Sequence, residues 1–224
     1  MSKQQVLLSW SGGKDSSLAL YEISRNYKDL EIEALLTTLT RDYNRISMHG
    51  VRKDLLLLQS KSLKIPLEEV WIPSKATNEI YEKEMIKSIN KCKERGATSM
   101  VFGDLFLEDI RSYREKFLSN IDIECIFPLW EKDTRELAEF FLKSGFKAII
   151  STVDPKKLDP KFCGREYDEK FLSEIPSNVD HCGENGEFHT FVYDGPIFKE
   201  GKIDIQVGEI VQRDGFYFAD LLSR

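Results

Sequence analysis

The segment Ser11–Ser16 constrains this chain more than any other, because its sequence, Ser-Gly-Gly-Lys-Asp-Ser, is typical of a loop that binds phosphate. An apolar run at residues 6–10 precedes it, and an apolar pattern with helical spacing begins at Leu18. Glycines let backbone N–H groups approach an anion, and a helix N-terminus adds unpaired donors and the positive end of its dipole. The segment therefore predicts a strand, a loop and a helix around a phosphate group, with serine hydroxyls and the Lys14 ammonium as further ligands.

Two common phosphate-binding loops do not match this segment. A Walker A loop needs Gly-Lys followed by Ser or Thr, whereas Asp15 follows Gly13-Lys14, and no Gly-x-Gly-x-x-Gly fingerprint is present. The segment resembles instead the PP-loop of the ATP pyrophosphatase superfamily, whose pattern is Ser-Gly-Gly-x-Asp-Ser. That resemblance implies that ATP is cleaved between its α and β phosphates and that the loop binds the departing pyrophosphate. Asp15 would repel a bare phosphate, so we expect it to hold Mg²⁺ beside the phosphates or to cap the helix.

The composition excludes several classes of protein. The 224 residues allow one large domain or two small ones, and 41% hydrophobic and 31% charged residues are ordinary for a globular protein. No apolar run is long enough to cross a membrane, and the first expected strand begins too early for a signal peptide to precede it. The net charge of −6 does not favour nucleic acid as a partner.

The cysteines and histidines do not suggest a zinc site or a disulfide framework. Four cysteines occur without a Cys-x-x-Cys pair, and only three histidines are available. No cysteine pair suits sulfur transfer either. We expect a cytoplasmic protein with reduced thiols, in which Cys92, Cys125 and Cys163 pack as small apolar side chains. Cys182 lies nearest the suspected site but has no clear base partner.

Strand-like and helix-like segments alternate through the first half of the chain. This alternation predicts an α/β fold, with a parallel five-stranded sheet covered by helices on both faces. Ligands of such sheets bind at the carboxyl ends of the strands, where the Ser11–Ser16 loop and Gly103-Asp104 are expected. Strands are expected at 5–10, 32–38, 67–72, 99–102 and 121–127, and helices at 15–26, 51–63 and 78–95.

The pattern changes in the second half. We expect an ATP-binding domain at 1–127 and a smaller α+β domain, which binds the substrate, at 128–224. A helix is expected at 133–144, strands at 148–153 and 188–193, and a closing hairpin at 203–212 and 216–222.

Polar side chains crowd into Gly183–Thr190, just before one of these strands. The two glycines permit tight turns, so Glu184, Asn185, Glu187 and His189 are expected to point into a shared space. Clusters of this kind bind a cation, position an amine or move a proton. A polar turn without a catalytic role is the alternative interpretation.

Together the two motifs resemble the diphthine–ammonia ligase family of PP-loop ATPases, and the resemblance runs almost from end to end. The PP-loop is shared with many ligases, whereas the segment from Gly183 to Pro196 is far more specific. The resemblance implies the HUP-type sheet of the adenine nucleotide alpha hydrolases in the first domain. The matching segments are Ser11–Ser16, Ser47–His49, Gly103–Asp109, Arg114-Glu115, Pro128–Trp130, Gly164-Arg165, Gly183–Thr190 and Asp194–Pro196.

The resemblance also implies a reaction. ATP adenylates a substrate carboxylate with release of pyrophosphate, and ammonia then displaces AMP to leave an amide. Activation is needed because oxide is a poor leaving group, whereas AMP leaves readily. The implied substrate is diphthine, a modified histidine on elongation factor two, or a related carboxylate. Free ammonia, or ammonia from a partner, is the expected nitrogen source.

The expected site residues follow from the motifs and the resemblance. ATP with Mg²⁺, and also AMP, should bind at the carboxyl ends of the first, second and fourth strands, with adenine near residues 36–38 and Met48. The expected nucleotide ligands are Ser9, Ser11, Gly12, Gly13, Lys14, Asp15, Ser16, Leu36, Thr37, Thr38, Met48, Gly103 and Asp104. Asp15 and Asp104 are also the expected magnesium ligands. The expected catalytic residues are Glu184, Asn185, Glu187 and His189, and either Glu187 or His189 would take the proton lost in amide formation.

Two other functions stay open at this point. A tRNA-modifying PP-loop enzyme of the lysidine or thiolation type would share the loop, but the acidic charge and the lack of a Cys-x-x-Cys pair count against it. A regulatory module that binds ATP or AMP without turnover would need no second polar site, so the Gly183–Thr190 cluster counts against it. The oligomeric state is also open, and a homodimer is compatible with the sequence.

Overall fold

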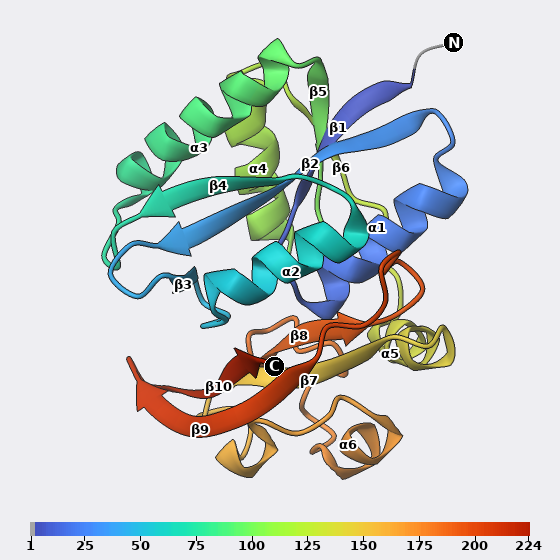
Figure 1. The fold of residues 1–224 in the computed structure, drawn as a ribbon, viewed down its shortest axis with the longest axis vertical. Helices are drawn as coiled ribbons and strands as arrows, with labels where there is room; N and C mark the ends of the chain where they lie inside the picture. Colours follow the sequence, from blue (N-terminus) through green and yellow to red (C-terminus); the bar gives the residue numbers. More distant parts are fainter. Residues whose placement is uncertain (1–2) are drawn as a thin grey trace.

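The computed structural model describes residues 3–224, which form two β-sheets with helices between them (Figure 1). The strands of the first sheet are β1 (Gln4–Ser9), β2 (Leu30–Thr40), β3 (Arg45–Ile46), β4 (Leu67–Ile72), β5 (Ala97–Val101) and β6 (Glu124–Ile126). Five of them run parallel in the order β4-β2-β1-β5-β6, and the two-residue β3 pairs antiparallel with the end of β2. Val6, Leu7 and Leu8 of β1 are fully buried, as expected where helices cover both faces of a parallel sheet.

Helices cover both faces of the first sheet (Figure 1). They are α1 (Lys14–Asn26), α2 (Lys53–Leu63), α3 (Asn78–Glu94) and α4 (Glu108–Ser119). On one face Ile89 of α3 and Phe117 of α4 pack against the strands. On the other face Leu18 of α1 and Leu55 of α2 do so, and these two helices also face the second sheet.

The second sheet is antiparallel throughout, with its strands in the order β8-β7-β10-β9. The elements of this half are α5 (Thr134–Lys143), β7 (Lys147–Val153), the 3₁₀ turn η1 (Pro160–Phe162), α6 (Glu169–Glu174), β8 (Phe188–Asp194), β9 (Ile205–Arg213) and β10 (Phe216–Ser223). Among residues 3–224, no helix has both the length and the apolar character that a membrane span requires.

A buried glutamine joins the two halves at the loop after β1. The side chain of Gln59 accepts a hydrogen bond from Trp10 Nε1 at 2.9 Å and donates to the carbonyl oxygens of Gly12 and Val192 at 3.0 and 2.7 Å. The Val192 amide also donates to the Gly12 carbonyl at 2.9 Å. One hydrophobic core runs from α1 and α2 into the second sheet, so the division at residue 127 stays a prediction.

The predicted α/β fold, with its parallel five-stranded sheet and a smaller mixed second half, is confirmed. Thr77 caps α3, since its side chain accepts from the Ile80 amide. The helix α4 and the six-residue α6 were not predicted from the sequence. In α4 the apolar spacing at Ile110, Tyr113 and Phe117 carries the helical signal, although charged residues dominate the segment.

Candidate active site

The loop between β1 and α1 is open toward a ligand. Gly13 is the N-cap residue of α1, and no side chain caps this helix, so Asp15 is not a cap. The Gly13 amide donates to Ser11 Oγ at 3.3 Å, and the Lys14 amide donates to Thr190 Oγ1 at 3.0 Å. The next amides of the first turn have no partner within the helix. The loop therefore offers backbone donors at the positive end of a helix dipole, which suits a phosphate group.

Close approach explains the glycines around this loop. Gly12 has φ +73°, a left-handed conformation that disfavours other residues. A Cβ on Gly13 would lie 3.0 Å from the Thr190 carbonyl oxygen, and one on Gly103 would lie 2.8 Å from the backbone of Asp15. The chain at Gly103 and the chain at Thr190 therefore both lie directly against the loop.

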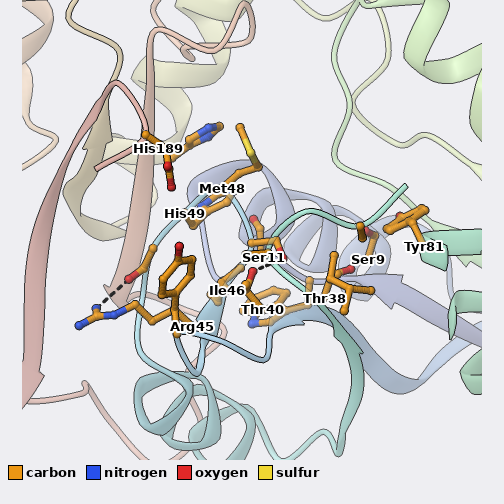
Figure 2. Close-up of a pocket in the computed structure, with 18 of the residues that line it drawn as sticks. Ser9, Ser11, Thr38, Thr40, Arg45, Ile46, Met48, His49, Tyr81 and His189 are labelled. Atoms are coloured by element: carbon orange, nitrogen blue, oxygen red, sulfur yellow. Dashed lines mark hydrogen bonds between the residues drawn. The ribbon is translucent and has the colours of Figure 1, made fainter. Parts of the chain in front are cut away.

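A cavity of about 730 Å³ lies at the carboxyl ends of β1, β2 and β4 (Figure 2). Five of the predicted nucleotide ligands line it, namely Ser9, Ser11, Leu36, Thr38 and Met48. Thr37, which points to the opposite face of β2 and is buried, does not line it. In Figure 2, Ser9, Thr38 and Tyr81 lie at one end of this cavity, and His49, Met48 and His189 lie at the other.

A smaller cavity of about 240 Å³ adjoins the first beside the loop. It brings together the predicted residues Ser9, Ser11, Lys14, Asp15, Ser16, Gly103, Asp104, Glu184 and His189. Gly12 and Gly13 form the loop backbone and do not line either cavity. The predicted contact between the phosphate-binding loop and part of the Gly183–Thr190 cluster is therefore present.

Lys14 and Asp15 form an ion pair in the smaller cavity. Lys14 Nζ lies 2.7 and 2.8 Å from the two carboxylate oxygens of Asp15, and the lysine side chain is 2% exposed. Burial disfavours the ammonium, but the charge of Asp15 and its hydrogen bonds with Lys14, with a smaller contribution from Glu184, outweigh it and raise the pKa of Lys14. Lys14 is therefore protonated, and a bound phosphate could replace Asp15 as the partner of its ammonium group.

Glu184 is the carboxylate of the second motif that reaches the cavity. Its Oε1 accepts a hydrogen bond from the Leu105 amide at 2.8 Å. Burial, with a smaller contribution from the charges of Asp15 and Asp104, raises the pKa of Glu184 to about 7. A carboxylate with this pKa can take a proton from an ammonium ion near neutral pH.

Glu187 and Asn185 do not reach either cavity. The Glu187 side chain is 3% exposed, and its Oε1 accepts from the Asp180 amide at 3.1 Å and from Asn185 Nδ2 at 3.2 Å. Asn185 is exposed, and its carbonyl accepts from Lys157. These contacts hold the turn together, and the predicted proton transfer by Glu187 finds no support in this placement.

The rings of His49 and His189 pack against each other where the two cavities meet, with centroids 4.3 Å apart and planes inclined by 31°. Nδ1 of His49 lies 3.4 Å from the Thr190 carbonyl oxygen. Burial lowers the pKa of His49 to about 4 and that of His189 well below its ordinary value. Both rings are therefore neutral at pH 7, which makes His189 a weak proton acceptor.

Asp104 pairs with an arginine of α4. Arg114 Nη2 donates to Asp104 Oδ1 at 3.0 Å, and Arg114 Nε lies 2.8 Å from Oδ2. Within residues 3–224, no three His, Cys, Asp or Glu side chains gather as a metal site requires. Both predicted magnesium ligands pair with a basic side chain, Asp15 with Lys14 and Asp104 with Arg114. Asp15 lies in the phosphate-binding loop itself, so it is the one placed to share a metal with phosphates.

The cysteines do not provide a nucleophile. All four are free thiols, and Cys182 is buried in the wall of the smaller cavity. Its Sγ donates to the Thr134 carbonyl at 3.3 Å, and burial raises the pKa of Cys182 to about 12. Burial also raises the pKa values of Cys92 and Cys125 to about 11 and that of Cys163 to about 12, so none is a thiolate near neutral pH.

Comparison with known proteins agrees with this geometry. A family model described as the diphthamide synthase N-terminal domain matches residues 3–125, and one described as the diphthamide synthase C-terminal domain matches residues 133–220. The chain belongs to the diphthamide synthase family. The two matches together include the phosphate-binding loop and the Gly183–Thr190 cluster.

Several relatives within this diphthamide synthase family carry the name diphthine–ammonia ligase. The Bos taurus protein is 28% identical over 192 residues, which is 79% of this chain and 70% of the relative. The Rattus norvegicus protein is 26% identical over 93% of this chain and 85% of its own length. The Schizosaccharomyces pombe protein is 25% identical over 93% of this chain but only 37% of its own length.

Several residues that line the two cavities were not predicted from the sequence. His49, Arg114 and Thr190 lie in segments that carried the family resemblance, but nothing in their spacing assigned them a role. Tyr81 lies on α3 and Phe218 on β10, and both reach the large cavity only through the tertiary fold.

Proposed function

We propose that this protein is an ATP-dependent ligase, which adenylates a carboxylate, transfers ammonia to it and releases AMP and pyrophosphate. The observation that carries the proposal is the meeting of two adjoining cavities at the phosphate-binding loop, one large enough for a nucleoside and the other holding Glu184. The relatives named diphthine–ammonia ligase support diphthine on elongation factor two as the carboxylate.

In this proposal the large cavity binds the nucleoside, and the smaller cavity binds the phosphates and holds the base. The loop amides and Lys14 hold the β and γ phosphates, while Leu36, Thr38 and Met48 surround the nucleoside. Glu184 takes a proton from ammonium, so that the neutral amine can attack the activated acyl group and AMP can leave. Mg²⁺, when bound, would neutralise phosphate charge, and Asp15 is the side chain that would hold it.

The products of the reaction test this proposal directly. Purified protein with ATP, ammonium and a diphthine-bearing elongation factor should form AMP and pyrophosphate, separated by chromatography. ADP and phosphate as the products would contradict the mechanism, and ATP binding without turnover would favour a regulatory module.

Substitution of Glu184 tests the proton transfer. Glu184→Gln keeps an acceptor for the Leu105 amide but removes the base, so turnover should fall by about 10²–10⁴-fold while ATP affinity barely changes. Glu187→Gln is the matched control, because the turn holds that side chain away from the cavity. Normal turnover in Glu184→Gln would exclude this role.

We also propose a cytoplasmic location with reduced thiols, which the four free cysteines support. A homodimer stays a prediction from the sequence, and sedimentation of the purified chain would test it.

A further inference from the structure

Five residues line both cavities at once: Ser9, Ser11, His49, Arg114 and His189. In the proposed function, on which this inference rests, the loop holds the pyrophosphate portion of ATP and the large cavity holds the nucleoside. The α-phosphate connects the two portions. It must therefore lie where the two cavities meet, beside these five residues.

Only one of the five carries a positive charge. His49 and His189 are neutral at pH 7, and the two serines offer hydroxyls. Lys14 lines only the smaller cavity, where it pairs with Asp15. It therefore lies at the end of the site that would hold the pyrophosphate portion of ATP. Arg114 is therefore the cation that both cavities share, and its five N–H donors suit a phosphate group.

The surroundings of Arg114 hold its side chain while leaving donors for a ligand. Its guanidinium lies 4.4 Å from the ring centroid of Phe102, and Asp104 contacts its Nε and Nη2. The contact between Nε and Asp104 Oδ2 is short but not aligned as a hydrogen bond, so both buried atoms keep unused hydrogen-bonding capacity. The Arg114 guanidinium is therefore held in place while part of its hydrogen-bonding capacity stays unused.

We propose that Arg114 is a catalytic residue that binds the α-phosphate during adenylation, and that Asp104 is the positioning residue that orients it. In this step a carboxylate oxygen of the substrate bonds to the α-phosphorus. The bond from that phosphorus to the bridging oxygen breaks, and its electron pair leaves with pyrophosphate. Arg114 stabilises the negative charge on the α-phosphate oxygens as the bonds change.

Ligand affinities without turnover test the placement of Arg114. Calorimetry in EDTA would compare adenosine, AMP and inorganic pyrophosphate, because only AMP carries the α-phosphate on a nucleoside. Arg114→Met should weaken AMP binding about ten- to a hundredfold, the range for hydrogen bonds to a charged group. Adenosine and pyrophosphate affinities should stay within about twofold of wild type.

Arg111→Met is the matched control on the same helix. Arg111 pairs with Glu115 and stacks over Trp130, and it does not line either cavity. This variant should bind all three ligands like wild type. Equal losses of affinity for adenosine and AMP in Arg114→Met would indicate a structural role. A loss of affinity confined to pyrophosphate would place Arg114 beside the pyrophosphate portion of ATP. Either result, or no change at all, overturns the proposal.

Magnesium dependence separates positioning by Asp104 from metal binding. Asp104→Asn should lower AMP affinity in EDTA by several-fold, and excess Mg²⁺ should not restore the rate of AMP formation. The Asp104→Asn/Arg114→Met double variant should bind AMP no worse than Arg114→Met alone, since Asp104 acts through Arg114. Full rescue by Mg²⁺, or additive losses, would contradict this role. The proposed function is judged separately, by whether the wild-type protein forms AMP and pyrophosphate.

Discussion

At the scale of single residues, the site holds ionisable groups in states that cost stability. Glu184 is the clearest case, because its pKa of about 7 lies above the ordinary value of 4.5. Between these two pH values the folded protein binds a proton that the unfolded chain has lost. Raising the pH through this window therefore destabilises the fold.

Glu184→Gln should accordingly stabilise the protein at pH 8, by on the order of 1 kcal/mol, while it removes activity. The gain should appear as the pH rises from about 4.5 to 7 and should be absent below that range. Chemical denaturation at several pH values would measure it. Glu209→Gln, at an exposed position of β9, should show no such pH dependence. A variant that is no more stable than wild type at pH 8 would contradict the assigned burial of Glu184.

At the scale of elements, the segment from β3 to the start of α2 is held by the second sheet. Asp220 of β10 accepts from Arg45 at 2.8 Å and from both Nε and Nη2 of Arg52 at 2.9 and 2.7 Å. Thr152 of β7 donates to the His49 carbonyl at 2.9 Å. The wall of the large cavity that contains His49 is therefore positioned from the other half of the chain.

Asp220→Asn should loosen this segment and lower the free energy of unfolding by about 1–3 kcal/mol at pH 7. The hydrogen bonds from Arg52, and then those from Arg45, lower the pKa of Asp220 to about 2. The stabilisation is therefore present above about pH 4 and is lost as the pH falls toward 2. Thermal unfolding would measure the change, with Asp204→Asn as control, because Asp204 pairs with Lys202 at the exposed surface. Equal effects of the two substitutions would contradict a positioning role for Asp220.

At the scale of the whole molecule, Gln59 links the first sheet to the second. Gln59→Leu would leave Trp10 Nε1 and the Val192 carbonyl without this partner inside the core. We expect a loss of about 2–5 kcal/mol in denaturant unfolding, together with weaker ATP binding, because each unsatisfied buried group costs about 1–3 kcal/mol. Gln206→Leu on the exposed face of β9 should change neither the free energy of unfolding nor ATP binding. A small loss in Gln59→Leu would mean that the halves are stabilised independently.

Much of the fold could be predicted because local patterns determine it. The Ser11–Ser16 loop, the alternating strands and helices and the Gly183–Thr190 cluster are each readable over a few residues. The direction of side chains within that cluster was not readable. Gly183 and Gly186 have φ +69° and +78°, and the turn they form sends Glu184 into the cavity and Glu187 into the interior. Arg114 was not predicted at this site because its place depends on how α4 packs, which no short pattern contains.

The hydrogen bonds that Gln59 and Val192 donate to the Gly12 carbonyl also have a consequence for folding during translation. A ribosome makes the phosphate-binding loop first, whereas strand β8, whose Val192 amide donates to the Gly12 carbonyl, begins only at Phe188. Through most of synthesis the loop therefore lacks the strand that shapes it. We expect a nascent chain released before Val192 to contain the whole phosphate motif without the strand that positions it, so the loop would reach its final shape only when translation is nearly finished.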